Sequence, residues 1–211
     1  MQPITKMSAR EQVTSTLRKA IFNGEFEDGE EIRQEDIAVR LGVSRMPVRE
    51  AFLLLERDGL LIMKNNKRAA VKLFTEEDFL EHYEIRALLE GEAAARAAAK
   101  NRDWSELEDI ILKLKQASEE NDTAAYVSHN ESFHRAIWKA SGSVRLESFL
   151  NQLWGGLPTH LPELLPNQME KSKQEHKEIF ETIKNGNAAE AKEKIISHLE
   201  RSKKDFIDSR K

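Results

Sequence analysis

The spacing of hydrophobic residues separates the chain into a mixed first third and a helical remainder. Residues 9–22 carry apolar side chains at helical spacing, and residues 34–59 contain two shorter helical patterns around a turn at residues 42–44. Short apolar runs at residues 60–62 and 70–73 follow, with a polar tip between them. The pattern therefore predicts three helices and then a two-stranded hairpin.

The turn and its two flanking helices form a helix-turn-helix pattern. Ser44 stands where its hydroxyl can accept a backbone N–H of the second helix, and Pro47 occupies the first turn, where a missing N–H costs nothing. The apolar residues of that helix gather on one face, whereas Arg45 and Arg49 lie one turn apart on another. Outward-pointing arginines suit a DNA major groove, although a buried helical hairpin has the same apolar spacing.

The hairpin after this helix favours DNA binding over a buried hairpin. Gly59 follows the helix as a C′ glycine does, and the polar tip at residues 64–68 is rich in Lys and Arg. A small hairpin with a basic tip is typical of the wing of a winged helix. We expect the two arginines to contact bases or phosphates, and the wing to meet phosphates or the minor groove. The predicted DNA-binding residues are Ser44, Arg45, Arg49, Lys67 and Arg68.

A net negative charge argues against a DNA partner, but the charge is unevenly distributed along the chain. The whole chain has a formal net charge of −4. Residues 1–73, however, hold 13 Lys and Arg against 11 Asp and Glu, a net +2, and the remainder is net −6. The basic side chains of the first part concentrate on the second helix and the wing, and such local clustering decides how phosphates are met. The acidic remainder discourages non-specific wrapping of DNA.

Composition narrows the class of protein further. With 211 residues, 39% hydrophobic and 33% charged, the chain fits one large globular domain or two small ones. It has no run of 18 apolar residues, and its N-terminus lacks the apolar core of a signal peptide. It also contains no cysteine, which excludes disulfides and thiolate chemistry. We expect a cytoplasmic protein without a membrane span.

Residues 74–211 read as helices throughout, without strand alternation. Capping signals separate the helical patterns: Ser105 opens a capping box, and Asp122 and Asn187 stand at N-cap positions. Glycines and three prolines interrupt the pattern at residues 155–166. We predict an antiparallel bundle of six or seven helices.

Three histidines lie on or beside apolar faces of this bundle. His134, His176 and His198 come from three different predicted helices, and Asn130 lies one turn before His134 on the same face. Three imidazoles and an oxygen ligand would suit zinc, nickel or a similar borderline metal. Spacing alone is a weak signal, because a buried histidine is more often a core residue with satisfied hydrogen bonds. The other histidines are interpreted as surface or rim residues: His82, His129 and His160.

A second group of candidates lies on the first bundle helix. One stripe of that helix, at spacings of four, three and four, is formed by Phe79, Tyr83, Arg86 and Glu90. A charged pair that continues an aromatic stripe can line a cavity, and the planar fork of an arginine matches a carboxylate. The alternative is a surface salt bridge between Arg86 and Glu90, worth about 0.3–0.5 kcal/mol. We name Arg86 and Tyr83 as candidate effector-binding residues.

The N-terminal part resembles a known family. The string IFNGEFEDGEEIRQEDIAVRLGVSRMPVREAFLLLERDGLL contains the elements G-x-F-x-x-G, LGVSR-x-PVREA and L-x-x-DGL. It is similar to the DNA-binding domain of the GntR family of bacterial transcription regulators. The resemblance covers about the first 73 residues. One departure is Ala69 after the wing arginine, where the family usually has glycine, so we expect a slightly different turn at the wing tip.

The second part resembles an FCD domain, the effector domain of the FadR-like subgroup of that family. The resemblance rests on HYEIRALLEGEAA, N-x-x-FH-x-x-I, EH-x-x-I and ISHLE. It implies a metal site at Asn130, His134, His176 and His198, where the family more often has aspartate at the first position. A neutral amide there would weaken the pull on a divalent cation. The family's E-x-R-x-x-x-E pattern falls on Glu84, Arg86 and Glu90.

The resulting hypothesis is a mainly α-helical, bacterial DNA-binding transcription regulator. Residues 1–73 would form a winged helix-turn-helix, and residues 74–211 an FCD-like bundle that dimerises and binds a small effector. We expect a homodimer, because one recognition helix buries too little for tight specific binding and two-fold proteins read palindromes. The expected effector is an organic acid anion at the metal-dependent pocket that the resemblance implies.

Two other functions share parts of this pattern. A metal-dependent hydrolase with an appended DNA-binding domain would also use three histidines and an open metal position. Against it, no carboxylate is clearly placed as a general base, because Glu131 and Glu175 point to other faces than the ligand candidates beside them. A helical protein-interaction adaptor is the other alternative, and the basic wing argues against it.

Overall fold

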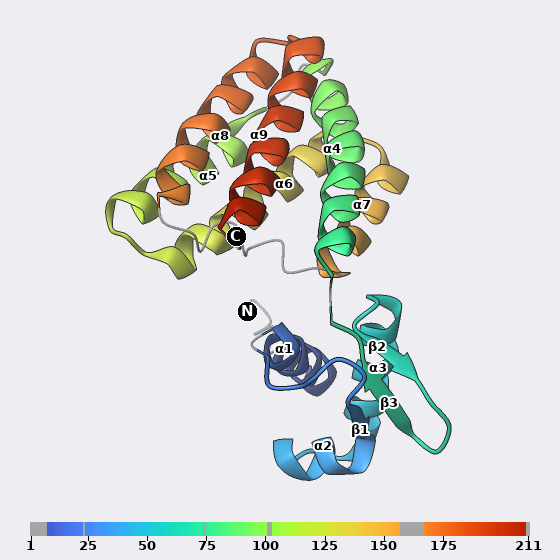
Figure 1. Ribbon diagram of the computed structural model, residues 1–211. Coiled ribbons are helices and arrows are strands. Elements are labelled where there is room, and N and C mark those ends of the chain that lie inside the picture. The colour runs from blue at the N-terminus through green and yellow to red at the C-terminus, as the bar shows by residue number, and fades with distance from the viewer. Residues whose placement is uncertain (1–7, 23, 74, 101–102, 157–166, 210–211) are drawn as a thin grey trace, which may run out of the picture. The chain divides into compact units, whose positions relative to one another are not determined.

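The computed structural model describes residues 8–22, 24–73, 75–100, 103–156 and 167–209. The chain divides into two compact units, with the boundary between Thr75 and Glu76. Figure 1 traces each unit along the chain. No helix in the described ranges is long and apolar enough to cross a membrane.

The first unit combines three helices with a small sheet. Its elements are α1 (Ala9–Phe22), β1 (Glu31–Arg33), α2 (Gln34–Leu41), α3 (Arg45–Arg57), β2 (Leu61–Met63) and β3 (Arg68–Val71). The sheet is antiparallel with strand order β1-β3-β2. The predicted hairpin corresponds to β2 and β3, but the sequence missed β1. That strand has three residues and one buried side chain, Ile32, which is too short to show a period of two.

A single core holds this unit together, and α3 contributes its centre. Val48, Ala51, Phe52 and Leu55 of α3 are fully buried. They repeat at spacings of three, one and three, so one face of the helix packs inward while the opposite face stays outside. Helix α1 packs against α3 through Val13, Leu17 and Ile21.

The ends of α3 differ in how they are capped. Gly59 has a φ of 76°, and the N–H groups of Gly59 and Leu60 bond to the carbonyls of Glu56 and Leu55, as in a Schellman motif. The predicted C′ glycine is therefore confirmed. Ser44 occupies the N-cap position, but its side chain makes no cap hydrogen bond, so the predicted role of its hydroxyl is wrong.

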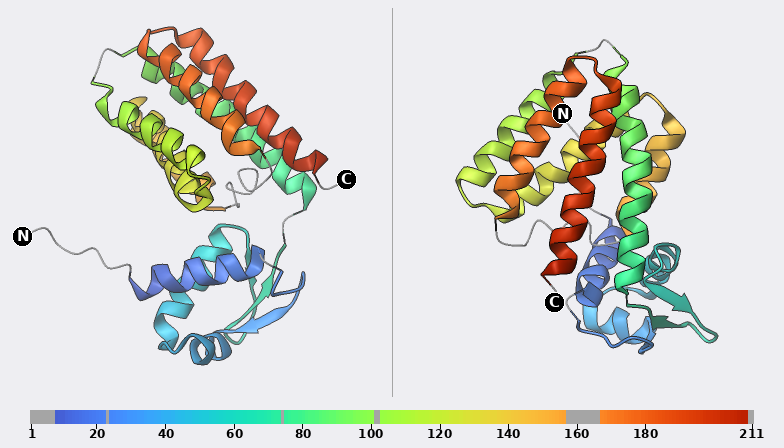
Figure 2. Two further views of the ribbon diagram at one scale, coloured as in Figure 1. Left: turned by 90° about the vertical axis from the view of Figure 1, so that its left-hand side faces the viewer. Right: turned by 45° about the horizontal axis from the view of Figure 1, so that its top comes forward.

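The second unit is a bundle of helices, as predicted. Its described elements are α4 (Glu76–Ala98), α5 (Ser105–Glu119), α6 (Thr123–Ala140), α7 (Val144–Gly156), α8 (Gln168–Lys184) and α9 (Ala188–Asp208). Helices α8 and α9 form a hairpin, and α4 lies along α9 (Figure 1, Figure 2). Gly91 permits this close approach, because a Cβ atom there would lie 3.1 Å from Cγ1 of Ile196.

The predicted caps of the bundle helices were partly right. Asp122 and Asn187 are N-caps whose side chains accept N–H groups from Ala125 and Glu190. Ser105, in contrast, does not open a capping box. It is the first residue of α5, and its own N–H donates to Asp103, which turns the chain into the helix. The segment at residues 157–166 lies outside the described residues.

Candidate DNA-binding surface and metal centre

The recognition helix α3 presents the predicted arginines to solvent. Because the buried face of α3 belongs to the core, Arg45 and Arg49 project outward and are exposed, as is Ser44 in the turn before them. The two arginines lie one turn apart at the N-terminal end of the helix, the end that contacts base edges in helix-turn-helix proteins. Their placement is compatible with the predicted DNA contacts.

The wing differs from the sequence prediction at Arg68. The turn between β2 and β3 passes through Asn66 and Lys67, each with a φ of 60°, and Lys67 is exposed at the tip. Arg68 begins β3 instead of lying in the tip, and its Nη1 is 3.1 Å from Oε2 of Glu31 on β1. Lys67 is therefore the more accessible cation of the wing.

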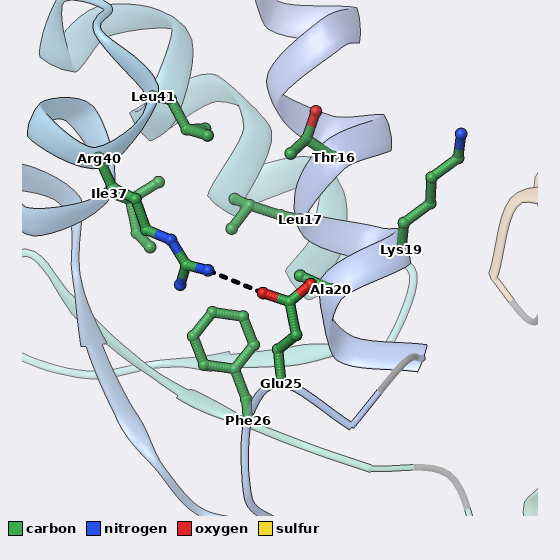
Figure 3. Close-up of a pocket in the computed structure, with 9 residues that line it drawn as sticks. All are labelled: Thr16, Leu17, Lys19, Ala20, Glu25, Phe26, Ile37, Arg40 and Leu41. Carbon is green, nitrogen blue, oxygen red and sulfur yellow. Dashed lines mark hydrogen bonds and ion pairs between the residues drawn. The ribbon is translucent and has the colours of Figure 1, made fainter.

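A pocket of about 310 Å³ also lies in this unit, between α1, α2 and the turn that follows α1. Its wall is mainly apolar and includes Leu17, Phe26 and Ile37. Figure 3 shows Arg40 and Glu25 pointing toward one another, at 2.7 Å between Nη2 and Oε2. Lys19 also lines the pocket. Arg40 and Glu25 neutralise each other, and the histidine trio and Arg86 lie in the other unit, so we do not assign this pocket to the functional site.

The second unit brings the three predicted histidines together. His134 of α6, His176 of α8 and His198 of α9 are all buried, at no more than 2% exposure. Each offers a ring nitrogen, and these three atoms lie within 4.8 Å of one another. The two Nε2 atoms of His176 and His198 are 3.3 Å apart. Such a trio can hold a metal ion, because three converging imidazoles are a common ligand set.

Two carboxylates, buried Glu90 and half-buried Glu175, hold two rings of this trio in place. Oε2 of Glu90 lies 2.6 Å from Nδ1 of His134, and Oε2 of Glu175 lies 2.6 Å from Nδ1 of His198. Each contact occupies Nδ1 and leaves Nε2 for other partners. Carboxylates that bond to the second nitrogen of a ligating histidine are typical of protein metal sites. The buried Nδ1 of His176, in contrast, has no hydrogen-bond partner among the described residues.

The sequence did not reveal the contact that Glu175 makes with the trio. Glu175 does point away from His176, the histidine beside it on α8. It contacts His198 on the neighbouring helix α9 instead. Helical spacing describes faces within one helix and could not reveal this contact. The contact of Glu90 with His134 was missed for the same reason.

The ion pair of Arg86 and Glu90 lies inside the bundle. Nε of Arg86 is 2.7 Å from Oε1 of Glu90, and the two side chains are 3% and 1% exposed, so the surface salt bridge is excluded. The guanidinium lies over the rings of Tyr83 and Trp154, at 4.8 and 4.6 Å from the centroids. Trp138 donates its indole N–H to Oε2 of Glu90 at 3.1 Å. Glu90 thus contacts both Arg86 and His134, and so links the arginine to the histidine trio.

Burial and neighbouring charges set the protonation of the centre. Burial lowers the pKa of His176 well below its usual value, and it lowers the pKa of His198 to about 4. Burial alone would raise the pKa of Glu90, but Arg86 and His134 outweigh it and leave that pKa well below the usual range. His176 and His198 are therefore neutral near pH 7, which is the form that binds metals.

The other candidates occupy varied positions. Asn130 is buried on α6, one turn before His134, and Tyr83 is buried on α4. His82 is also buried, with 7% exposure, so its interpretation as a surface residue is wrong. It lies one turn before Arg86, and burial lowers its pKa to about 3. His129 is half-buried, and His160 lies outside the described residues.

The fold and these sites define a DNA-binding transcription regulator with a helical sensory domain. Residues 9–71 match the family "Bacterial regulatory proteins, gntR family", and residues 81–201 match the FCD domain family. The chain therefore belongs to the GntR family and carries the FCD domain of its FadR-like subgroup. Regulators of this family bind DNA operators and small-molecule effectors.

Individual relatives agree with this assignment. The uncharacterized HTH-type transcriptional regulator YdhC of Bacillus subtilis is 30% identical, over 89% of this chain and 86% of that protein. A probable D-xylose utilization operon transcriptional repressor of Paenarthrobacter nicotinovorans is 27% identical, over 93% and 88%. The solved structure of E. coli McbR/YncC has the same fold, with a TM-score of 0.77 at 23% identity, covering 98% of this chain and 100% of that one. The matched families and relatives are transcription regulators and not enzymes, so the hydrolase alternative is not retained.

Proposed function

We propose that this regulator acts as a homodimer on a palindromic operator and responds to a small acidic effector held at a metal ion. Residues 1–73 serve as the DNA-binding domain, and residues 74–211 as the effector-binding and dimerisation domain. Arg45 and Arg49 read or flank the half-site, while Lys67 and Arg68 approach phosphates or the minor groove. Because the partner is chromosomal DNA, the protein works in the cytoplasm.

The observation that carries the sensory half of the proposal is the buried histidine trio. His134, His176 and His198 converge from three helices with ring nitrogens within 4.8 Å. They fit a divalent transition metal, zinc or nickel before others, because imidazole is a borderline ligand. Asn130 supplies a neutral and therefore weaker fourth ligand. The metal, when bound, supplies a Lewis-acidic positive charge that attracts an anion.

Arg86 is the residue that holds the effector's carboxylate. Its guanidinium is buried, charged and planar, and Glu90 links it directly to His134. A metal with four protein ligands keeps positions for a carboxylate oxygen if its geometry is octahedral. Tyr83 lies against the guanidinium and completes this wall of the site.

Exposed apolar side chains on α4 and α7 support a homodimer. Ile85 and Leu88 of α4 are 46% and 69% exposed, and Phe149 of α7 is 61% exposed. The two helices lie side by side in Figure 1 and Figure 2 and share a small apolar cluster. Large exposed apolar residues on neighbouring helices are typical of an interface, and a second copy of the chain is the occupant we propose.

The metal and the operator are tested on the full chain. Elemental analysis after purification without a metal-affinity step should find one transition metal per chain, or one should bind when zinc is added. Selection from a random duplex pool should yield a palindromic sequence. Absence of metal after zinc addition, with no rise in melting temperature, would contradict the metal site.

The effector is tested by calorimetric titration of a panel of small carboxylic acids, with and without metal. Arg86→Lys should fold and bind operator, yet respond poorly to the acid that binds the parent, because lysine lacks the planar fork. Arg96→Lys is the matched control, because Arg96 forms the equivalent ion pair on the exposed side of α4. Equal affinity for the acid with and without metal would contradict a metal-bound effector.

A further inference from the structure

Two arginine–glutamate–histidine series converge on the trio with the same atom pattern. In the first, Nε of Arg86 contacts Oε1 of Glu90, and Oε2 of Glu90 contacts Nδ1 of His134. Trp138 adds an N–H to the same carboxylate. One carboxylate oxygen therefore faces an arginine, and the other faces a histidine of the trio.

The second series repeats this pattern on the other side of the trio. Nε of Arg201 is 2.6 Å from Oε1 of Glu175, and Oε2 of Glu175 is 2.6 Å from Nδ1 of His198. Nη2 of Arg201 also donates to Oε2 of Glu175 at 2.7 Å, so the guanidinium holds the carboxylate in a two-pronged contact. Such planar pairs fix orientation as well as charge.

Arg201 makes further hydrogen bonds besides those with Glu175. Its Nη1 donates to Gln168 at 2.5 Å and to Asp205 at 3.1 Å, and its Nη2 donates to Ser172 at 3.0 Å. Gln168 in turn donates to Asp205 at 2.8 Å. All three guanidinium nitrogens thus have acceptors, and the network extends from the first turn of α8 across to α9.

We propose that Glu175 and Arg201 are positioning residues of the metal centre, an inference that rests on the proposed metal site. Glu175 keeps the proton of His198 on Nδ1, which leaves the lone pair of Nε2 directed toward His176 and the metal. The carboxylate also makes that imidazole a stronger donor to the metal. Arg201 prevents Glu175 from rotating away and balances its charge.

The chain also contains an ion pair between α8 and α9 that only joins the two helices, and it differs from the Arg201–Glu175 pair. Lys194 lies 3.1 Å from Glu178 across the same two helices, with both side chains partly exposed. That pair joins the helices through a single contact and touches no histidine of the trio. The Arg201–Glu175 pair instead directs a carboxylate oxygen at the ring of a buried histidine.

The experiment measures Zn²⁺ affinity of the full chain by competition with a chromogenic chelator. Glu175→Gln should weaken binding about 10- to 100-fold, the range typical of such outer partners. Arg201→Lys should also weaken Zn²⁺ binding, because an ammonium group cannot make the two-pronged contact with Glu175. The effect should be smaller than that of Glu175→Gln, because the carboxylate that contacts His198 is still present. The control Lys194→Gln should stay within about twofold of the parent, as expected for a partly exposed pair.

A second measurement separates positioning from loss of fold. With Co²⁺ in place of Zn²⁺, the visible absorption bands of Glu175→Gln should shift, because His198 is no longer fixed, while those of Lys194→Gln should not. Unfolding in excess chelator reports the fold of each variant. If Glu175→Gln does not fold, Arg201→Lys decides the question.

The outcomes distinguish this inference from the metal site on which it rests. If the parent binds zinc and both folded variants bind it within about twofold with unchanged cobalt spectra, the positioning role is wrong and the metal site stands. If the parent binds no metal, the metal site fails and the inference fails with it.

Discussion

Replacing Glu90 by glutamine should destabilise the protein far more than the same change at a matched surface position. Arg86 and Glu90 form an ion pair of 2.7 Å between Nε and Oε1, with side chains 3% and 1% exposed. On the same helix, Arg96 and Glu92 form a pair with the same atoms and the same 2.7 Å distance, but 51% and 42% exposed. The two pairs differ chiefly in their access to water.

The size of the effect follows from that difference. Glu90→Gln leaves the guanidinium of Arg86 buried without its countercharge, and breaking a buried pair from one side costs about 3–5 kcal/mol. It also weakens the hydrogen bonds that His134 and Trp138 make with the carboxylate. Glu92→Gln should cost only about 0.3–0.5 kcal/mol, the usual value of an exposed i,i+4 pair.

The assay is urea unfolding of the parent and both variants, in excess chelator so that metal binding does not contribute. We expect the midpoint of Glu90→Gln to fall well below that of Glu92→Gln, with similar slopes. A cost below about 1 kcal/mol for Glu90→Gln would mean that water reaches the pair as it reaches an exposed one. The proposal that Arg86 binds the effector as a buried arginine would then be wrong.

Three further predictions concern DNA, metal and pH. Truncation of Arg45 or Arg49 to alanine should cost about 1–3 kcal/mol of operator binding and relax sequence specificity. Lys67→Ala should instead weaken binding to all DNA sequences alike and reduce its salt dependence. Gel shifts at several salt concentrations test both expectations, and parent-like binding by both arginine variants would refute the assignment. Asn130→Asp should tighten metal binding in chelator competition, because a charged oxygen replaces a neutral one; unchanged affinity would remove Asn130 from the ligand set. His82 should make the fold acid-sensitive: its pKa is lowered to about 3, so stability is complete above the unfolded value of 6.5 and is lost as pH falls from there toward 3. Between pH 7 and 5 His82 accounts for a loss of about 2 kcal/mol. In urea unfolding the parent should therefore lose about 2 kcal/mol more than His82→Leu, in which His176 and His198 still titrate; an equal loss in parent and variant would contradict this prediction.

Much of the fold could be predicted because its signals are local. The apolar face of α3 and the left-handed Gly59 each depend on residues within one helix and its cap. The short strand β1 could not be predicted, because its three residues become a strand only by pairing with β3. Arg68 was misplaced for the same reason, since that pairing draws it into the sheet.

The histidines of the candidate site could be predicted from the sequence, but the contacts between them and the carboxylates could not. Helical spacing indicated that His134, His176 and His198 face a core, and the family resemblance grouped them. The carboxylates that orient the rings belong to other helices, α4 and α8, so no spacing within one helix could identify Glu90 or Glu175 as partners. His82 was misread because burial of a polar residue depends on what packs over the helix, which sequence position alone does not give.

The connections explain how an acidic effector could be recognised in a site that already contains carboxylates. Arg86 is neutralised by Glu90, and Arg201 by Glu175 and Asp205, so the arginines alone offer little net attraction to an anion. A divalent cation at the trio adds charge that neither glutamate cancels directly, since each faces the Nδ1 side of its histidine. The proposed effector therefore needs the metal for affinity and Arg86 for orientation. On this proposal the same glutamates would direct the histidines at a bound metal and, in its absence, would leave the site with little net attraction for an anion.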